Sequence, residues 1–347
     1  MTNSNSSGSQ CRIAVDAMGG DFAPENAVLG ALQAYEEGKK FQLLLVGKKD
    51  DIVKVASSHN LSITEDMIIH TDEVIEMGDS PTSSLKKKLN SSLVIGPKLV
   101  REKKADGFVS AGNTGAMTMS SVLNIGRIKG VSRPTLTAPF PNEKQGYTFI
   151  SDVGAFVDSR PSHLLEFALL SSIFIEEIYE IKNPKVGLLN VGEEEGKGYQ
   201  LTTETAKLLS ASKLNYVGNV EGKDIFKGKV DLVICDGFIG NILLKFAESI
   251  IPFLRAQLKS YANQRLINKL RAGFVRTPLR ESLKTANYEL QGGLPLLGVN
   301  GISIVGHGSS TPLAIKNMVL RAKEMHDKKL IDKLRIEIEQ YSNTQNN

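Results

Sequence analysis

Three turns of this sequence place glycine, asparagine, serine or aspartate directly after a short apolar run. They are residues 110–116 (SAGNTGA), 236–241 (DGFIGN) and 305–312 (VGHGSSTP). Glycine lets a ligand approach the backbone closely, and the polar side chains can cap the helix that follows. Such a turn presents free N–H groups to an anion. A single turn of this kind is more often a capped turn without a ligand, but three of them predict a phosphate or carboxylate site.

Two further side chains could assist chemistry at such a site. His307 lies between two glycines, where it could act as an acid, a base or a hydrogen-bond donor, or serve a structural role. Lys197, in the segment GEEEGKG (192–198), could place a positive charge on a phosphate or be a solvated lysine beside three glutamates. Aspartates also follow several apolar runs, where they can bind a divalent cation or, more commonly, cap a helix: Asp16, Asp21, Asp152, Asp158 and Asp236.

Several familiar site types are absent from the sequence. No G-x-G-x-x-G fingerprint occurs, and residues 192–198 are one residue short of a P-loop and lack its hydroxyl residue. Neither G-x-S-x-G nor H-E-x-x-H occurs, which disfavours elbow-type serine hydrolases and zincins. Cys11 and Cys235 are far apart and form no Cys-x-x-Cys pair, so we expect neither a Cys-based zinc site nor a disulfide framework. Burial as a small hydrophobic residue is the expected role of Cys235.

The elements that must position these residues follow one repeated pattern. A short β-branched or aliphatic run leads through a polar turn into a stretch with helical periodicity, and this happens at least six times. The runs predict strands of about 5 residues and helices of about 10–15, which is typical of βαβ crossovers. We therefore predict an α/β fold with an open, largely parallel and buried sheet. The expected strands are 12–16, 42–46, 107–110, 148–152, 186–191, 230–235 and 302–305.

Residues 250–290 depart from this alternation. They contain no evident strand, and eight basic side chains are interleaved with apolar ones. Gly273 and Pro278 are expected to break the segment, so we predict a basic helical hairpin that projects from the sheet. It could form a dimer interface with a solvated basic face, or dock on anionic lipid or an acidic protein. The residues expected on this partner or membrane surface are Arg265, Lys269, Arg271, Phe274 and Arg276.

The composition is that of a soluble globular protein. The chain has 347 residues, a net charge of +4 at pH 7 and 41% hydrophobic residues, which is enough to bury a large core. We expect a disordered tail at 1–11, a single α/β domain at 12–335 and a polar tail at 336–347. No secretory signal is evident, and the apolar stretch 239–254 is interrupted by two charges and a proline. We therefore expect a cytoplasmic protein without a transmembrane segment.

Eight stretches of the sequence together resemble one family. They extend in order over nearly the whole chain: 13–31 (IAVDAMGGDFAPENAVLGA), 110–116 (SAGNTGA), 132–136 (SRPTL), 152–158 (DVGAFVD), 187–198 (GLLNVGEEEGKG), 235–245 (CDGFIGNILLK), 292–301 (GGLPLLGVNG) and 307–310 (HGSS). On these stretches the chain resembles the PlsX family, the acyl-[acyl-carrier-protein]:phosphate acyltransferases of bacterial phospholipid synthesis.

The resemblance implies a reaction and its partners. Inorganic phosphate would attack the thioester of a long-chain acyl carrier protein and give an acyl phosphate, which a membrane acyltransferase would pass to glycerol 3-phosphate. It also implies a homodimer, no cofactor, and a fold similar to isopropylmalate dehydrogenase and phosphotransacetylase. We expect no metal and no nucleic-acid partner. Peripheral contact with the inner face of the cell membrane would be compatible with the basic hairpin.

This reaction suggests roles for the candidate residues. Phosphate is already an anionic nucleophile, so the enzyme needs an anion cradle, oxyanion donors and exclusion of water. We assign charge stabilisation to His307 and Lys197, and the orientation of donors to Asp16 and Asp21. The residues expected to bind phosphate or the thioester are Gly19, Gly20, Gly112, Asn113, Thr114, Gly115, Gly240, Asn241, Gly308, Ser309 and Ser310.

Two other functions fit parts of the sequence. A metal- and NAD-dependent decarboxylating dehydrogenase on a similar fold could use the strand-end aspartates to bind magnesium, although the dinucleotide fingerprint is absent. A non-catalytic regulator that binds a lipid surface or a carrier protein would use the basic hairpin and leave the glycine turns structural.

Overall fold

The chain folds into two compact units, described here from a computed structural model of residues 10–38, 40–282 and 288–345. Unit 1 comprises Met1–Pro134 and Gln291–Asn347, and unit 2 comprises Thr135–Leu290. The sequence suggested one domain at 12–335, whereas the contacts within the chain divide that range in two. Most of the expected tail at 1–11 lies outside the described residues, but Cys11 begins a strand.

Unit 1 contains a six-stranded sheet with the order β3-β2-β1-β4-β11-β10. All its strands run parallel except β10, which pairs antiparallel with β11. The central strands β1 and β4 are buried almost throughout, as expected for a parallel sheet covered on both faces. The strands are β1 (Cys11–Asp16), β2 (Phe41–Gly47), β3 (Ile68–His70), β4 (Gly107–Ser110), β10 (Leu294–Leu297) and β11 (Ile302–Val305).

Two groups of helices cover the unit-1 sheet. Helices α1 and α11 pack on each other and on the strands, whereas α4 and α5 form a separate group against β1, β4 and β11. The helices are α1 (Glu25–Gly38), α2 (Lys49–Ser58), α3 (Pro81–Lys87), α4 (Ser92–Arg101), α5 (Thr114–Ser120), α11 (Pro312–Asp327) and α12 (Leu330–Gln345). Short turns η1 (Glu65–Met67) and η2 (Ser121–Ile125) complete the unit.

Helix α12 differs from the expected polar tail at 336–347. The helix continues to Gln345, and Leu334 and Ile338 are buried on its inner face. Polar residues dominate the end of the sequence, but an apolar residue on every fourth position is enough to hold an amphipathic helix.

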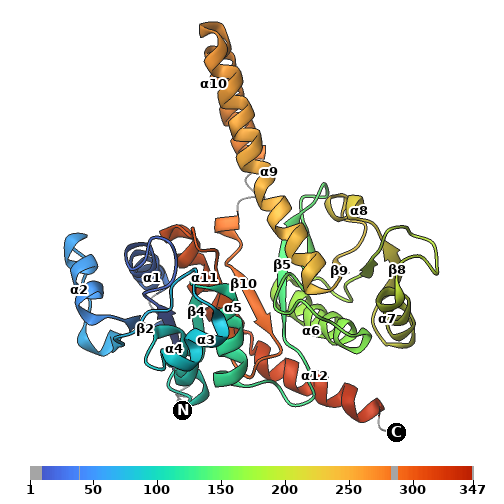
Figure 1. The fold of residues 1–347 in the computed structure, drawn as a ribbon, viewed down its shortest axis with the longest axis horizontal. Coiled ribbons are helices and arrows are strands. Elements are labelled where there is room, and N and C mark those ends of the chain that lie inside the picture. Colours follow the sequence, from blue (N-terminus) through green and yellow to red (C-terminus); the bar gives the residue numbers. More distant parts are fainter. Residues whose placement is uncertain (1–9, 39, 283–287, 346–347) are drawn as a thin grey trace, which may run out of the picture. The chain divides into compact units, whose positions relative to one another are not determined.

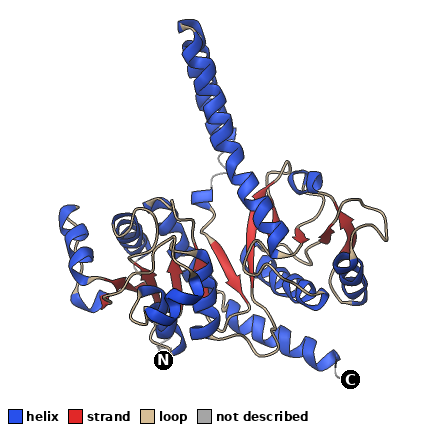
Figure 2. Ribbon diagram, viewed as in Figure 1, coloured by secondary structure: helices blue, strands red, loops and turns tan. Residues whose placement is uncertain are grey.

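Unit 2 contains a five-stranded sheet with the order β5-β6-β9-β7-β8. Strands β6, β9, β7 and β8 are parallel, and β5 pairs antiparallel with β6. From β6 to α9, strands and helices alternate along the chain as the sequence pattern predicted, and Figure 2 shows these elements by type. The strands are β5 (Thr135–Pro141), β6 (Tyr147–Ser151), β7 (Val186–Leu189), β8 (Tyr216–Val220) and β9 (Leu232–Ile234). The helices are α6 (Pro161–Tyr179), α7 (Gln200–Ala211), α8 (Gly222–Lys227), α9 (Gly237–Gln264) and α10 (Leu266–Ser282), with η4 at Tyr288–Leu290.

Helices α9 and α10 form the hairpin predicted from the basic segment, and Figure 1 shows them side by side and extended away from the unit-2 sheet. The position of the break was predicted wrongly. Gly273 and Pro278 lie inside α10, and the chain turns at Arg265, whose backbone is extended. Among the described helices, α9 alone is long and apolar enough to cross a membrane, and 11% of its most apolar window is buried. The charges and the proline that argued against a transmembrane segment therefore leave α9 within the length and composition that such a segment needs.

In each sheet the chain reverses its direction of strand addition. In unit 1, β2 and β3 lie on one side of β1, whereas β4 lies on the other. In unit 2, β8 lies on one side of β7, whereas β9 lies on the other. Ligands of open α/β sheets bind beyond the carboxyl ends of the strands at such switch points. The α/β fold class is confirmed, and it directs attention to the ends of β1 and β4 and of β7 and β9.

The contact between α1 and α11 predicts a steric limit at Gly30. A Cβ atom there would lie 2.5 Å from both Ile315 Cβ and the Pro312 carbonyl oxygen. We expect Gly30→Ala to lower the free energy of unfolding by about 1–3 kcal/mol, because the helices must separate. Urea unfolding followed by circular dichroism measures the change.

Gly273→Ala is the matched control for Gly30→Ala. No atom lies within 4 Å of a Cβ at Gly273, which is exposed within α10. Alanine should be neutral there or stabilise by about 0.5–1 kcal/mol. Equal unfolding midpoints for Gly30→Ala and the wild type would contradict the steric interpretation.

Candidate functional site

Three glycine turns meet at the switch point of unit 1, beyond the ends of β1, β4 and β11. The Asp21 N–H donates to the Gly308 carbonyl oxygen at 2.8 Å, which joins the first turn to the third. A Cβ on Gly19 would lie 2.8 Å from the Gly112 nitrogen, so the first and second turns also touch. Gly20 has a φ of +110°, which favours glycine. We call these turns, residues 16–21, 110–115 and 306–310, the glycine cluster.

The buried carboxylate of Asp16 fixes the positions of the first two turns of the glycine cluster. Its Oδ2 accepts from the Ser110 hydroxyl at 2.7 Å, and its Oδ1 accepts from the Met18 N–H at 3.0 Å. The Ser110 Oγ in turn accepts from the Gly112 N–H at 2.9 Å. Asp16 is only 2% exposed, and this burial raises the pKa of its carboxyl group. The Asp16 side chain therefore lies beneath the surface of the cluster and is hydrogen-bonded to Ser110 and Met18.

His307 lies at the exposed edge of the glycine cluster. Its Nδ1 accepts from the Ser309 N–H at 3.2 Å and lies 2.8 Å from the Ser309 hydroxyl. A backbone N–H can only donate, so the neutral ring carries its proton on Nε2. Ser310 is buried and donates both its hydroxyl and its N–H to the His307 carbonyl oxygen, at 2.6 and 2.9 Å. The turn thus fixes the ring in one tautomer.

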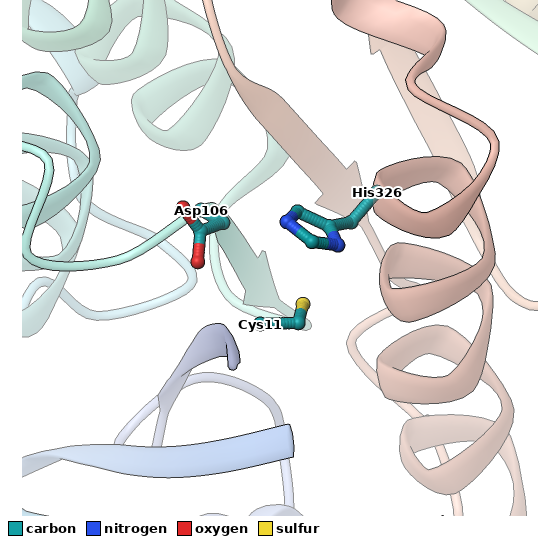
Figure 3. Close-up of side chains that lie close together, drawn as sticks. All are labelled: Cys11, Asp106 and His326. Carbon is teal, nitrogen blue, oxygen red and sulfur yellow. The ribbon is translucent and has the colours of Figure 1, made fainter. Parts of the chain in front are cut away.

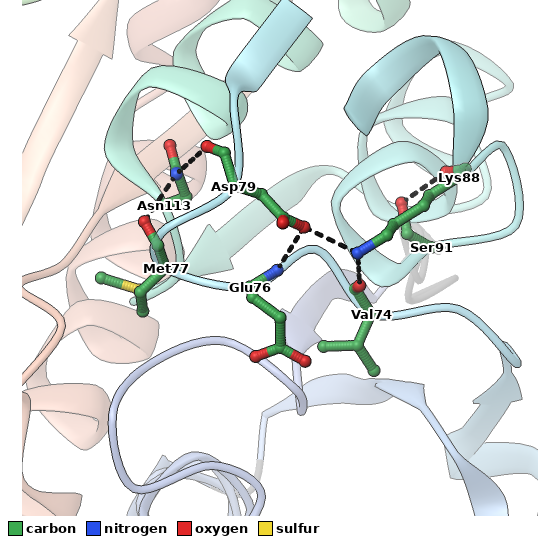
Figure 4. A network of polar contacts seen from close by, with 7 residues as sticks. All are labelled: Val74, Glu76, Met77, Asp79, Lys88, Ser91 and Asn113. Atoms are coloured by element: carbon green, nitrogen blue, oxygen red, sulfur yellow. Dashed lines mark hydrogen bonds and ion pairs between the residues drawn. The ribbon is translucent and has the colours of Figure 1, made fainter. Parts of the chain in front are cut away.

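The side chain of Asn113 has a different role from the one expected. Its Oδ1 caps α5 by accepting from the Ala116 N–H at 2.9 Å. Its Nδ2 donates to the carbonyl oxygens of Met77 and Asp79, at 2.9 and 3.0 Å. Both amide protons are therefore used within the protein (Figure 4). Asn113 fastens a neighbouring loop to the cluster, and only its backbone faces the turn that follows β4.

That loop, residues 74–79, covers part of the glycine cluster and is held by Lys88. The Lys88 Nζ donates to the Val74 carbonyl oxygen at 2.7 Å and to Asp79 Oδ2 at 2.6 Å (Figure 4). This ion pair lowers the pKa of Asp79. A Cβ on Gly308 would lie 2.6 Å from Met77 Cε, so the loop reaches the third turn. The sequence analysis did not find Met77, Asp79 or Lys88, because no motif links them to the turns they support.

The remaining candidates in unit 1 line the same cluster. Thr114 and Gly115 begin α5 and are exposed, and Asp21 is exposed on the first turn. Unit 1 therefore brings together twelve predicted residues: Asp16, Gly19, Gly20, Asp21, Gly112, Asn113, Thr114, Gly115, His307, Gly308, Ser309 and Ser310.

The other predicted residues belong to unit 2. Lys197 is exposed in the turn that follows β7, where its carbonyl oxygen accepts from Asn190 Nδ2 at 2.8 Å. Gly240 and Asn241 lie in the first turn of α9. A Cβ on Gly240 would lie 1.8 Å from the Asp152 carbonyl oxygen, which gives this glycine a packing role. The hairpin residues Arg265, Lys269, Arg271, Phe274 and Arg276 also lie in unit 2, on or next to α10.

Two aspartates fix the carboxyl edge of the unit-2 sheet. Asp236 caps α9, with Oδ1 accepting from Phe238 N–H and Ile239 N–H at 3.0 Å and Oδ2 accepting from the Tyr199 hydroxyl at 3.0 Å. Asp152 is fully buried and accepts backbone N–H bonds from Leu136 at 2.8 Å and Phe156 at 3.0 Å. Asp236 therefore has the capping role that is commoner for such aspartates, whereas Asp152 joins strand β5 to the loop that follows β6.

One group of potential metal ligands occurs among the described residues, at the start of β1, away from the glycine cluster. The ligand atoms of Cys11, Asp106 and His326 lie within 4.8 Å of one another (Figure 3). Arg12 already donates its N–H to Asp106 Oδ2 at 2.8 Å, and burial raises the pKa of the Cys11 thiol to about 12. A neutral thiol and an occupied carboxylate favour a structural role for this group over a metal site.

Comparison with known proteins shows which family model and which relatives match this chain. Residues 11–333 match the family model described as "Fatty acid synthesis protein". A phosphate acyltransferase of Dictyoglomus turgidum is 44% identical over 315 residues, which covers 90% of this chain and 94% of that protein. A phosphate acyltransferase of Chlorobaculum parvum is 44% identical over 331 residues, which covers 93% of this chain and 97% of that protein.

Solved structures share the fold at low sequence identity. A phosphotransacetylase from Streptococcus pyogenes matches with a TM-score of 0.61 and 18% identity, covering 94% of this chain and 95% of that chain. A 4-hydroxythreonine-4-phosphate dehydrogenase from Klebsiella pneumoniae matches with a TM-score of 0.52 and 12% identity, covering 91% and 99%. These likenesses concern the fold, which acyltransferases and dehydrogenases both use.

The buried carboxyl group of Asp152 predicts a pH dependence of stability. Burial raises its pKa from 3.8 to about 6. Its contribution is fully present below pH 3.8 and is lost as the pH rises through 6, because the folded state then holds a charged, desolvated carboxylate. Asp152→Asn removes this titration. We expect the destabilisation caused by Asp152→Asn to shrink by roughly 3 kcal/mol between pH 4 and 7.5.

Urea unfolding of both proteins at each pH measures this difference and cancels the titration of the other groups. A difference between the wild type and Asp152→Asn that stays constant from pH 4 to 7.5 would contradict the raised pKa.

Proposed function

We propose a substrate pair for this chain, which belongs to the phosphate acyltransferase family and is therefore an acyltransferase. In our proposal the acyl acceptor is inorganic phosphate and the donor is the thioester of a long-chain acyl carrier protein. A phosphate oxygen attacks the thioester carbonyl carbon, the carbon–sulfur bond breaks, and the products are an acyl phosphate and the carrier thiol. The acyl phosphate then serves phospholipid synthesis.

The meeting of three glycine turns around Asp16 carries this proposal. Backbone N–H groups on close glycine turns suit a phosphate or a developing oxyanion. Both cysteines are poor nucleophiles, because burial raises the pKa of Cys11 to about 12 and that of Cys235 well above its ordinary value. A site that binds phosphate as the attacking nucleophile needs no cysteine nucleophile. The family membership favours this transferase over the dehydrogenase and over the non-catalytic regulator.

In the proposed mechanism, backbone N–H groups of the glycine cluster bind the substrates, and side chains stabilise charge and position the donors. The backbone N–H groups of Asn113, Thr114, Gly115 and Gly308 bind phosphate and the thioester oxygen, because those of Gly112, Ser309 and Ser310 already donate within the cluster. His307 donates from Nε2 to the oxygen that gains charge, since its Nδ1 is held by Ser309. Asp16, fixed by Ser110 and Met18, keeps the donors in position.

The hairpin of α9 and α10 supports the proposed partners. Its exposed apolar side chains include Phe246, Phe253, Leu266 and Phe274, which are 60–82% exposed. Interleaved arginines and lysines make the same surface basic. These two properties together suit an acidic carrier protein, a second copy of the chain, or the edge of an anionic membrane. We propose a cytoplasmic homodimer that contacts the inner face of the membrane and delivers acyl phosphate to a membrane glycerol-3-phosphate acyltransferase.

The proposed role of His307 predicts a loss of turnover on substitution. His307→Ala should lower turnover by about 10²-fold or more, the usual scale for loss of one electrostatic donor. The assay incubates the protein with palmitoyl-acyl carrier protein and phosphate and traps acyl phosphate with hydroxylamine. Product that forms equally without phosphate is subtracted as direct aminolysis.

His59→Ala is the control for His307→Ala, because His59 is exposed and pairs with Glu25 away from the glycine cluster. It should keep wild-type turnover. Wild-type turnover in His307→Ala would remove this histidine from the mechanism, and the absence of phosphate-dependent product from the wild type would refute the proposed reaction.

Docking of an acidic carrier on the hairpin predicts a salt-dependent KM. The KM for the acyl carrier should rise roughly threefold or more between about 0.05 and 0.3 M NaCl, because screening weakens attraction between exposed charges. Lys269→Glu with Arg271→Glu should raise the KM at low salt and flatten this dependence. The exposed lysines Lys207 and Lys213, changed to glutamate, provide a control of equal charge in the same unit. A KM that does not change with the NaCl concentration would argue against docking on the hairpin.

A further inference from the structure

An apolar cavity of about 280 Å³ lies at the switch point of unit 2. It is formed by the carboxyl ends of β7 and β9 together with α6, α7 and the first turns of α9. Its apolar lining consists of Leu164, Leu188, Leu189, Val191, Ile239 and Leu243. The volume is close to the lower end of small-molecule sites, about 300 Å³. The fold therefore provides a second ligand-sized space, separate from the glycine cluster and of opposite chemistry.

Every polar side chain that lines this cavity already has a hydrogen-bond partner within the protein. The Tyr199 hydroxyl donates to Asp236, and the Thr202 hydroxyl donates to the Tyr199 carbonyl oxygen at 2.8 Å. Asn190 Nδ2 donates to the Lys197 carbonyl oxygen and its Oδ1 accepts from the Val191 N–H at 2.9 Å. The Cys235 Sγ donates to the Asp152 carbonyl oxygen at 3.6 Å.

Because the polar side chains of the lining are already hydrogen-bonded within the protein, the cavity favours an apolar ligand. A polar guest would give up its bonds to water and find few unpaired groups in return, which costs free energy. Among the residues that the structure describes, no lysine or arginine side chain lines the cavity, so a phosphate or nucleotide would lack a charge partner there. An alkyl chain loses nothing on entry, and each buried methylene strengthens binding by about fourfold.

We infer that this cavity binds the distal part of the fatty acyl chain of the substrate. The inference rests on the proposed function, because only an acyl donor brings a long alkyl chain to the protein. The loop of residues 190–199 borders the cavity through Asn190, Val191 and Tyr199. A Cβ on Gly198 would lie 2.3 Å from Thr202 Oγ1 and 2.4 Å from Asn190 Oδ1, so the loop packs tightly against the cavity wall.

Filling the cavity should change chain-length preference. Leu243→Trp places a larger side chain on the α9 wall, where Leu243 is half-buried. We expect kcat/KM for palmitoyl carrier to fall at least tenfold, while kcat/KM for octanoyl carrier stays within about threefold of wild type. Leu189→Trp, on the facing β7 wall, tests the same space if the first variant folds poorly. Leu244→Trp is the matched control, since Leu244 adjoins Leu243 on α9 but does not line the cavity.

Binding of cis-parinaric acid, a fluorescent fatty acid, separates this inference from the proposed reaction. The wild type and Leu244→Trp should bind the probe, and the two cavity variants should bind at least tenfold more weakly. Retained probe binding by folded cavity variants, or equal loss of kcat/KM for both chain lengths, would overturn the inference. If the wild type binds the probe in the cavity but forms no acyl phosphate, the proposed reaction fails and the apolar site remains.

Discussion

The buried hydrogen bond between Asp16 and Ser110 is the constraint on which the candidate site depends. It joins the ends of β1 and β4, the two strands between which the unit-1 sheet reverses direction. Parallel strands diverge beyond their last paired residues, and this bond keeps their turns within reach of each other. The same hydroxyl accepts from Gly112, so one side chain sets the position of two turns. Glycine at position 19 follows from this bond, because a Cβ there would collide with the Asp16 carboxylate at 2.3 Å, and a Cβ at Gly112 would lie 3.1 Å from Ser110 Oγ.

Buried carboxylates fix the carboxyl ends of the strands in both units, but the surfaces near them differ in polarity. Asp16 accepts from Ser110 and Met18 beneath glycine turns that keep part of their backbone exposed, whereas Asp152 and Asp236 accept from donors at the carboxyl ends of the unit-2 strands. The turns of unit 1 leave a polar surface suited to an anion, and the carboxyl ends of β7 and β9 border an apolar cavity. In our proposal the polar surface binds phosphate and the cavity binds an acyl chain, and each lies where its sheet changes direction.

The sequence predicted the features that depend on local spacing and missed those that depend on distant contacts. Strand, glycine turn and helix alternate within about 30 residues, so the fold class and two turns of the glycine cluster, 110–115 and 306–310, could be inferred, whereas the turn at 236–241 predicted with them lies in unit 2. The capping role of Asn113 was also local, but its bonds to Met77 and Asp79 span more than 30 residues and left no pattern. The hairpin was predicted, yet its turn at Arg265 was not, because Gly273 and Pro278 looked like stronger breaks and the helix accommodates both.

The order of the chain through the two units affects how the protein folds during synthesis. Unit 2 is one continuous segment, but unit 1 needs residues on both sides of it. Strand β11 pairs with β4, which precedes unit 2 in the sequence, and helix α11 packs against α1, which lies near the other end of the sequence. A ribosome therefore releases unit 2 complete while the unit-1 sheet still lacks β10 and β11, which belong to the final segment Gln291–Asn347. The turn carrying His307 arrives in that final segment, so premature termination leaves a partial sheet without its third glycine turn.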